Sequence, residues 1–126
     1  LTSHLVVAVT KWQEVYDRLV AHLPVSVGKA LSAKERDEKG LATSTLVYGE
    51  IAFDSYAIAF QKIKNKYGGL TAPGGIYYDI GSGTGKPALA AALLHDFDKV
   101  TGIEILEGLH SSSIELLEKW NTEVGV

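Results

Sequence analysis

The sequence predicts an α/β fold with parallel strands, preceded by helices. Two observations predict it. From residue 76 onward the apolar pattern indicates strand, helix, strand and helix in turn, and this order implies parallel strands joined by right-handed crossovers. Upstream of residue 70, two apolar stretches recur at steps of three and four residues, which is the period of an amphipathic helix.

The composition fits one small domain. With 126 residues, 46% of them hydrophobic, the chain can bury a core of its own. The formal net charge of −3 gives no electrostatic reason to expect non-specific binding of nucleic acid. No apolar run approaches the roughly 20 residues that cross a bilayer. The N-terminal apolar patch lacks a basic leader and a cleavage site, so it is a poor signal peptide.

Cysteine and methionine are both absent. Without Cys the chain can form no disulfide, no thiol nucleophile and no Cys-based zinc site, which suits an intracellular protein. Because the chain starts at Leu and holds no Met, we expect it to be a piece of a longer product. No metal site is predicted, since the histidines show no ligand spacing: His4, His22, His95 and His110.

The first 44 residues are predicted to form a helical lead segment. An amphipathic helix ends at Pro24, and its apolar stripe consists of Leu5, Val9, Trp12, Tyr16, Leu19 and Leu23. From Pro24 to Ala42 the pattern is irregular. The alternating charges of "AKERDEKG" predict a solvated turn or a short helix that stops at Gly40, with a wet surface and no site.

Residues 45–126 are predicted to form the second unit. A helix from about Phe53 to Tyr67 is closed by Gly68 and Gly69. The β-branched and aromatic run "IYYDI" predicts a buried strand. Pro87 marks the first turn of the next helix. A second strand follows at about Val100 to Ile103, and the last helical stripe consists of Leu106, Leu109, Ser113, Leu116, Leu117 and Trp120.

A glycine loop joins the first strand to the helix after it, within "YYDIGSGTGKPALAAALL". A phosphate-binding P-loop requires G-x-x-x-x-G-K-[ST]. The sequence has Ile80 in place of the first Gly and Pro87 in place of the hydroxyl residue, so this motif is absent. A dinucleotide fingerprint G-x-G-x-x-G stays open but is weakened, because Lys86 stands in the third position, where helix and strand pack closely.

The third pattern is Asp-x-Gly-x-Gly-x-Gly, formed by Asp79, Gly81, Gly83 and Gly85. Glycine permits positive φ and lets a ligand approach the main chain with no Cβ between them. Glu104 stands at the end of the next strand, about 20 residues on, which is the spacing expected for a carboxylate that binds ribose hydroxyls. Asp79 can accept from the loop amides or reach a ligand's ammonium group. A loop with no ligand is the remaining alternative.

A second motif, "LVYGEIAFD", lies upstream. As a polar loop before a helix, Tyr48-Gly49-Glu50 could fold over the mouth of a ligand site. The same residues are also compatible with a structural role, in which Glu50 is a carboxylate favoured at a helix start and Tyr48 a packed aromatic. The pattern leaves both interpretations open.

Together the two motifs resemble the disruptor-of-telomeric-silencing family of histone lysine methyltransferases, which are not SET-domain proteins. The resemblance covers roughly Thr45 to Asn121 and rests on Tyr48-Gly49-Glu50-x-x-Phe53-Asp54 followed by Asp79-x-Gly81-Ser82-Gly83-x-Gly85. It implies a Rossmann-like class I methyltransferase fold, of which this chain is the N-terminal, cofactor-binding part. It also implies the cofactor S-adenosylmethionine.

The resemblance further implies residue roles. The Tyr48–Ile51 loop would line the cofactor and the lysine channel, with Tyr48 and Glu50 acting by positioning. Glu104 would hold the ribose. The complete expected cofactor set is Tyr48, Glu50, Asp79, Gly81, Ser82, Gly83, Gly85, Lys86 and Glu104. Lys86 departs from the polar amide expected at its position, and Ile51 stands where a hydroxyl side chain can occur.

The implied function is methyl transfer from S-adenosylmethionine to a lysine of a histone or nucleosome, in the nucleus. Two alternatives remain: a methyltransferase of the same fold, then expected in the cytoplasm, that acts on another protein, RNA or a small molecule, and a cofactor-binding module without catalysis. Two strands leave an exposed sheet edge that another chain could pair with. The piece alone is therefore not expected to catalyse.

Overall fold

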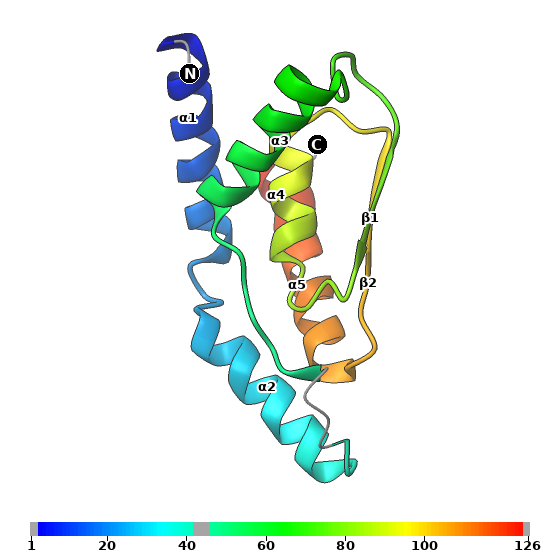
Figure 1. The fold of residues 1–126 in the computed structure, drawn as a ribbon. Coiled ribbons are helices and arrows are strands. Elements are labelled where there is room, and N and C mark those ends of the chain that lie inside the picture. The colour runs from blue at the N-terminus through cyan, green and yellow to red at the C-terminus, as the bar shows by residue number, and fades with distance from the viewer. Residues whose placement is uncertain (1–2, 42–45, 125–126) are drawn as a thin grey trace.

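The structure is a computed structural model that describes residues 3–41 and 46–124, with side chains from residue 11 onward. Five helices and two strands are described (Figure 1). Their bounds are α1 Ser3–Val20, α2 Val25–Glu38, α3 Phe53–Tyr67, β1 Ile76–Ile80, α4 Lys86–Leu94, β2 Lys99–Ile103 and α5 Glu107–Glu123. The strands form one layer, and the helices lie on one side of it.

The two strands pair in parallel, with Ile76 opposite Lys99 and Ile80 opposite Ile103. This pairing confirms the predicted order of strand, helix, strand and helix. The described residues hold only this two-stranded sheet, so they show a mixed helix and strand fold and not a complete Rossmann-like sheet. No helix among them is both long and apolar enough to cross a membrane.

Helix α4 is the centre of the core. Its sequence KPALAAALL is almost wholly apolar, as expected of a helix covered on several sides. Pro87 lies in its first turn, as predicted, where a missing amide proton costs nothing. The core cluster joins α4 to residues of α1, the turn after it, α3 and α5, and consists of Tyr16, Leu19, Leu23, Phe53, Leu89, Ala90, Leu93 and Leu116.

The two faces of the sheet differ. On the face toward the helices, the Tyr77 ring lies 6.3 Å from the ring of Phe60 and 5.4 Å from that of Phe97. On the opposite face the side chains of Ile76, Tyr78 and Ile80 are more than half exposed. The expectation that "IYYDI" is buried is therefore wrong for one face of β1.

Residues 25–38 form a full helix, α2, longer than the turn or short helix expected there. Pro24 precedes its first turn, and Gly40 follows its end with a positive φ of 66°. The hydrophobic period did not indicate this helix because its buried face consists of Gly28, Ser32 and Glu35. The expectation that this charged stretch is entirely solvent-exposed is thus wrong for Glu35.

Candidate functional site

The glycine loop, residues 79–86, connects β1 to α4. Gly81, Gly83 and Gly85 all have positive φ, at 79°, 57° and 91°, a conformation that side-chain-bearing residues rarely adopt. A Cβ at Gly83 would also lie 2.9 Å from the Tyr48 ring, whereas a Cβ at Gly81 would meet nothing within 4 Å. The loop therefore presents bare backbone to open space at Gly81.

Glu104, at the end of β2, points toward the glycine loop. Its Oε2 accepts a hydrogen bond of 2.7 Å from the Gly83 amide, and its Oε1 accepts one of 2.9 Å from the Leu106 amide. Each carboxylate oxygen has a second lone pair available for another donor. The parallel pairing of β1 and β2 brings Glu104 to the same end of the sheet as the loop.

Lys86 and Glu50 form an ion pair between α4 and the Tyr48 loop, residues 46–51. The Lys86 ammonium donates to both carboxylate oxygens of Glu50, at 2.8 and 3.0 Å. The Lys86 side chain is 8% exposed and that of Glu50 is 21% exposed. Such a pair is held in a low-dielectric environment, where leaving either charge alone is costly.

Tyr48 links this pair to the glycine loop. Its hydroxyl donates to Glu50 and lies 3.2 Å from the Thr84 hydroxyl. Burial, and after it the hydrogen bond to Glu50, raises the pKa of Tyr48 well above its usual range. The tyrosine is therefore a neutral donor at physiological pH.

The Asp79 carboxylate has one oxygen without a hydrogen-bond partner among the described residues. Its Oδ2 is buried and has no hydrogen-bond partner among the described residues. Burial, and then the charge of Glu104, raises the pKa of Asp79. An unpartnered buried acceptor beside open backbone is a position that a ligand's cation or donor could satisfy.

These groups surround a cavity of about 200 Å³, which we call the loop cavity. Seven of the expected residues line it: Tyr48, Glu50, Gly81, Ser82, Gly83, Lys86 and Glu104. Asp79 and Gly85 do not line it. A neighbouring cavity of about 570 Å³ lies toward α1 and α2 and shares Tyr48, Gly49, Glu50, Ile51 and Lys86 with it.

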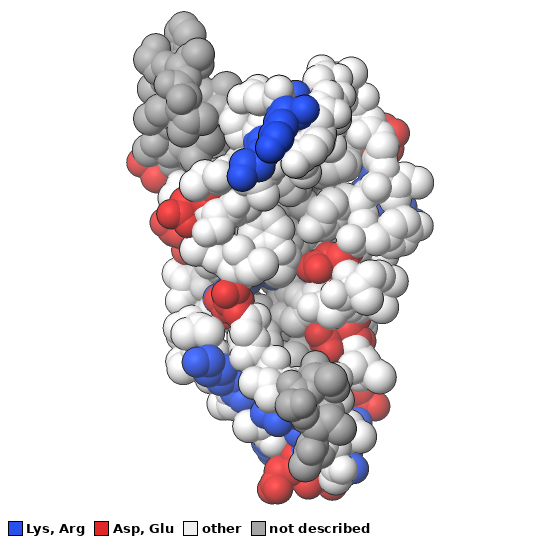
Figure 2. All heavy atoms as spheres, in the orientation of Figure 1, with Lys and Arg blue, Asp and Glu red and all other residues white. Residues whose placement is uncertain are grey.

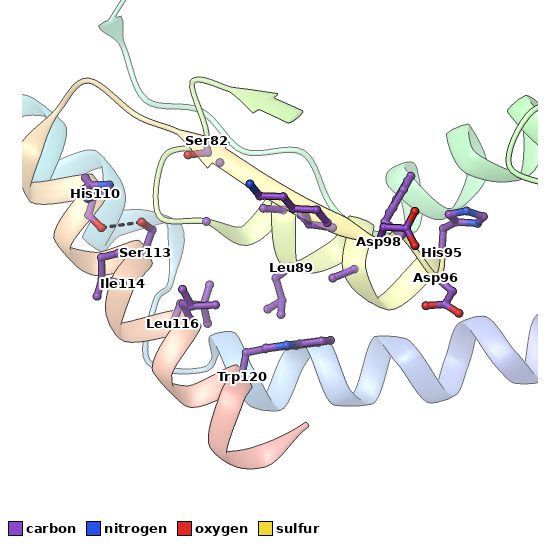
Figure 3. Close-up of a pocket in the computed structure, with 18 residues that line it drawn as sticks. Ser82, Leu89, His95, Asp96, Asp98, His110, Ser113, Ile114, Leu116 and Trp120 are labelled. Carbon is purple, nitrogen blue, oxygen red and sulfur yellow. Dashed lines mark hydrogen bonds between the residues drawn. The ribbon is translucent and has the colours of Figure 1, made fainter. Parts of the chain in front are cut away.

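A third cavity of about 430 Å³ lies between α4, β2 and α5, and we call it the apolar cavity (Figure 3). Leu89, Leu116 and Trp120 form much of its wall. His95 and the neighbouring acidic residues Asp96 and Asp98 lie at one end. It shares only Ser82 with the loop cavity.

Sequence reasoning missed Glu35 and Thr84. Glu35 of α2 accepts from the amides of Glu107 and Gly108 at 2.9 and 2.7 Å, and so caps the N-terminus of α5. The Gly108 hydrogen bond is the main reason why the pKa of Glu35 is lowered. The contacts of Glu35 with α5 and of Thr84 with Tyr48 join positions far apart in the chain, so no local pattern could indicate them. Among the described residues, no cluster of His, Asp or Glu forms a metal site.

The chain matches a known protein family. The model of the family described as histone methylation protein DOT1 matches residues 32–124. The matched range includes every residue that lines the loop cavity. Neither the curated proteins nor the solved structures give a match.

Proposed function

The chain belongs to the DOT1 family of histone methylation proteins, and from this premise we propose that it binds S-adenosylmethionine in the loop cavity for transfer of a methyl group to a histone lysine. The observation that carries the proposal is Glu104, whose carboxylate faces the positive-φ glycine loop. A histone acceptor implies that the protein acts in the nucleus.

The residues present fit this cofactor. Glu104 retains free lone pairs for two ribose hydroxyls, and hydrogen bonds to a charged acceptor are the stronger kind. The backbone at Gly81 is open, so a flat nucleoside can lie against it. The carboxylate of Glu50 lines the cavity and is an acceptor for an ammonium group, whereas the buried, unpartnered Oδ2 of Asp79 lies outside the cavity lining.

The bound cofactor would supply a sulfonium methyl group, and the protein would supply alignment and a dry environment. A lysine acceptor has an ordinary pKa of about 10.4 and must become neutral before it can attack. Tyr48 is a protonated donor and Glu50 is engaged by Lys86, so neither is placed as a general base. We therefore assign positioning roles to both, and the low dielectric of the site favours the neutral amine.

Nucleosome binding would be favoured by a surface rich in Lys and Arg, because these side chains neutralise DNA phosphates. On the face shown in Figure 2, the described basic side chains gather over α3 and near α2, with acidic side chains between them. This face is therefore mixed in charge and is not a uniformly basic surface for DNA.

Two measurements test the proposed function. Titration calorimetry of the chain with S-adenosylmethionine should give saturable one-to-one binding. Incubation of the full-length protein with methyl-labelled cofactor should transfer label to histone lysine in nucleosomes, with RNA as the competing acceptor. Absence of any binding would overturn the cofactor assignment, and label on RNA instead of histone would overturn the acceptor assignment.

A further inference from the structure

Two carboxylates share the first amides of α5. The Leu106 amide donates to Oε1 of Glu104 at 2.9 Å. The next two amides, those of Glu107 and Gly108, donate to the carboxylate of Glu35 at 2.9 and 2.7 Å. Leu106 stands at the N-cap position, and its side chain makes no capping hydrogen bond. Glu35 of α2 therefore supplies the cap that the N-cap residue of α5 does not provide.

The two carboxylates differ in what else they contact. Glu104 also accepts from the Gly83 amide and lines the loop cavity. Glu35 does not line that cavity, and its side chain is only 11% exposed. Lys39 lies 3.4 Å from the Glu35 carboxylate and compensates its charge. An effect of Glu35 on a ligand in the loop cavity must therefore pass through α5 and Glu104.

Helix α2 is also fixed against the Tyr48 loop, so the position of Glu35 is well defined. The Ser32 hydroxyl, one turn before Glu35, donates to the Leu46 carbonyl at 3.1 Å. A Cβ at Gly28 would lie 2.3 Å from the Tyr48 ring, so the helix and the loop pack with no room for a side chain there. The same helix thus contacts the Tyr48 loop and the segment that follows β2, and both contribute to the wall of the loop cavity.

Removal of the Glu35 carboxylate would leave two amides at the N-terminus of α5 without an acceptor. A helix N-terminus attracts a carboxylate, and Glu104 already bonds the adjacent amide of Leu106. The Glu104 carboxylate would then turn toward the free amides of α5 and give up the Gly83 amide. The cap from α2 removes this competition.

We infer that Glu35 is a positioning residue for ribose recognition: by holding the first amides of α5, it keeps the Glu104 carboxylate directed at the glycine loop. This inference rests on the proposed function. Its signature is specific, because loss of Glu35 should reduce the affinity gained from the ribose hydroxyls. A merely structural role would weaken ligands with and without these hydroxyls by the same factor.

The test compares two ligands in calorimetry with the full chain. S-Adenosylhomocysteine carries both ribose hydroxyls, and its 2′,3′-dideoxy analogue lacks them but keeps the adenine and the amino-acid end. The wild type should prefer the first ligand by about tenfold or more, as expected for hydrogen bonds to a charged acceptor. Glu35→Ala should reduce this preference to about threefold or less. Glu38→Ala removes an exposed glutamate of the same helix and, as the matched control, should keep the preference of the wild type.

Glu35→Gln keeps the size of the side chain and provides a second variant if Glu35→Ala folds poorly by circular dichroism. It replaces one acceptor oxygen by an NH₂ group that cannot accept, so the preference should fall here too, by at least about twofold. An equal loss of affinity for both ligands, with the preference unchanged, would overturn the inference while leaving the proposed function intact. Equal affinity of the wild type for the two ligands would overturn it as well, because Glu104 would then not hold the ribose. If the wild type bound neither ligand, the proposed function itself would fail, and the inference with it.

Discussion

The loop cavity and the apolar cavity differ in volume and in the chemistry of the residues that line them. The apolar cavity is about twice as large, at about 430 Å³ against about 200 Å³. Its central wall consists of side chains such as Leu89 and Trp120, which α4 and α5 turn toward each other. The loop cavity is smaller, but Glu50, Lys86 and Glu104 converge on it together with bare backbone. The chemistry of the lining, and not the volume, therefore makes the loop cavity the candidate site for a charged nucleoside.

The largest effect on stability is expected when one charge is removed from the loop cavity. Lys86→Met should lower the free energy of unfolding by about 3 kcal/mol, because Glu50 loses its partner while remaining largely buried. The double variant Lys86→Met/Glu50→Gln should cost less than about 1 kcal/mol. Urea denaturation measures both, and equal losses in the single and double variants would show that the charges are not coupled.

The next effect concerns the ribose contact. Glu104→Ala should weaken S-adenosylmethionine binding by about 1.5–3 kcal/mol, because charge-assisted hydrogen bonds are lost. Glu115→Ala, an exposed glutamate on α5, provides the control. Calorimetry on the two variants decides the question, and a change of less than about twofold for Glu104→Ala would contradict the assigned role.

Asp79 gives a smaller effect that depends on pH. Its pKa is raised in the folded state, so between the ordinary value, about 3.9, and the raised value the folded chain binds more protons than the unfolded chain. Its contribution therefore lowers stability as pH rises through that window. Without cofactor, Asp79→Asn should raise Tm at pH 7 by about 2–4 °C and have little effect below pH 3. A lower Tm at pH 7 would show that the ionised carboxylate has a stabilising partner.

The smallest effect on cofactor binding is expected from a substitution in the apolar cavity. Ala92→Leu adds volume inside the apolar cavity, which Ala92 lines. We expect stability to change by no more than about 1–3 kcal/mol and cofactor affinity to stay within about twofold of the wild type. Loss of binding in this folded variant would move the ligand to the apolar cavity.

The sequence predicted the parts of this molecule that depend on local rules. The strand, glycine loop and helix around Gly81 and Pro87 follow from backbone preferences, and parallel strands place Glu104 beside the loop. The ion pair between Lys86 and Glu50 was not predicted, although both residues were expected at the site. It depends on the Tyr48 loop returning across α4, which no local spacing encodes.

Helix α2 is another feature that the sequence pattern did not predict in full. Its buried face is small and polar, so hydrophobic periodicity did not indicate it. Glu35 belongs to a charge run that ordinarily faces water, yet two amides of α5 satisfy its carboxylate. Only tertiary packing distinguishes it from its exposed neighbours, and Glu35 in turn holds the start of α5 directly after Glu104.

A crystal structure of the chain with S-adenosylhomocysteine tests the central claim most directly. We predict that the nucleoside lies in the loop cavity, with its ribose hydroxyls on the Glu104 carboxylate and its ammonium group at the Glu50 carboxylate. A nucleoside bound between α4, β2 and α5, with Glu104 still bonded only to the amides of Gly83 and Leu106, would contradict it.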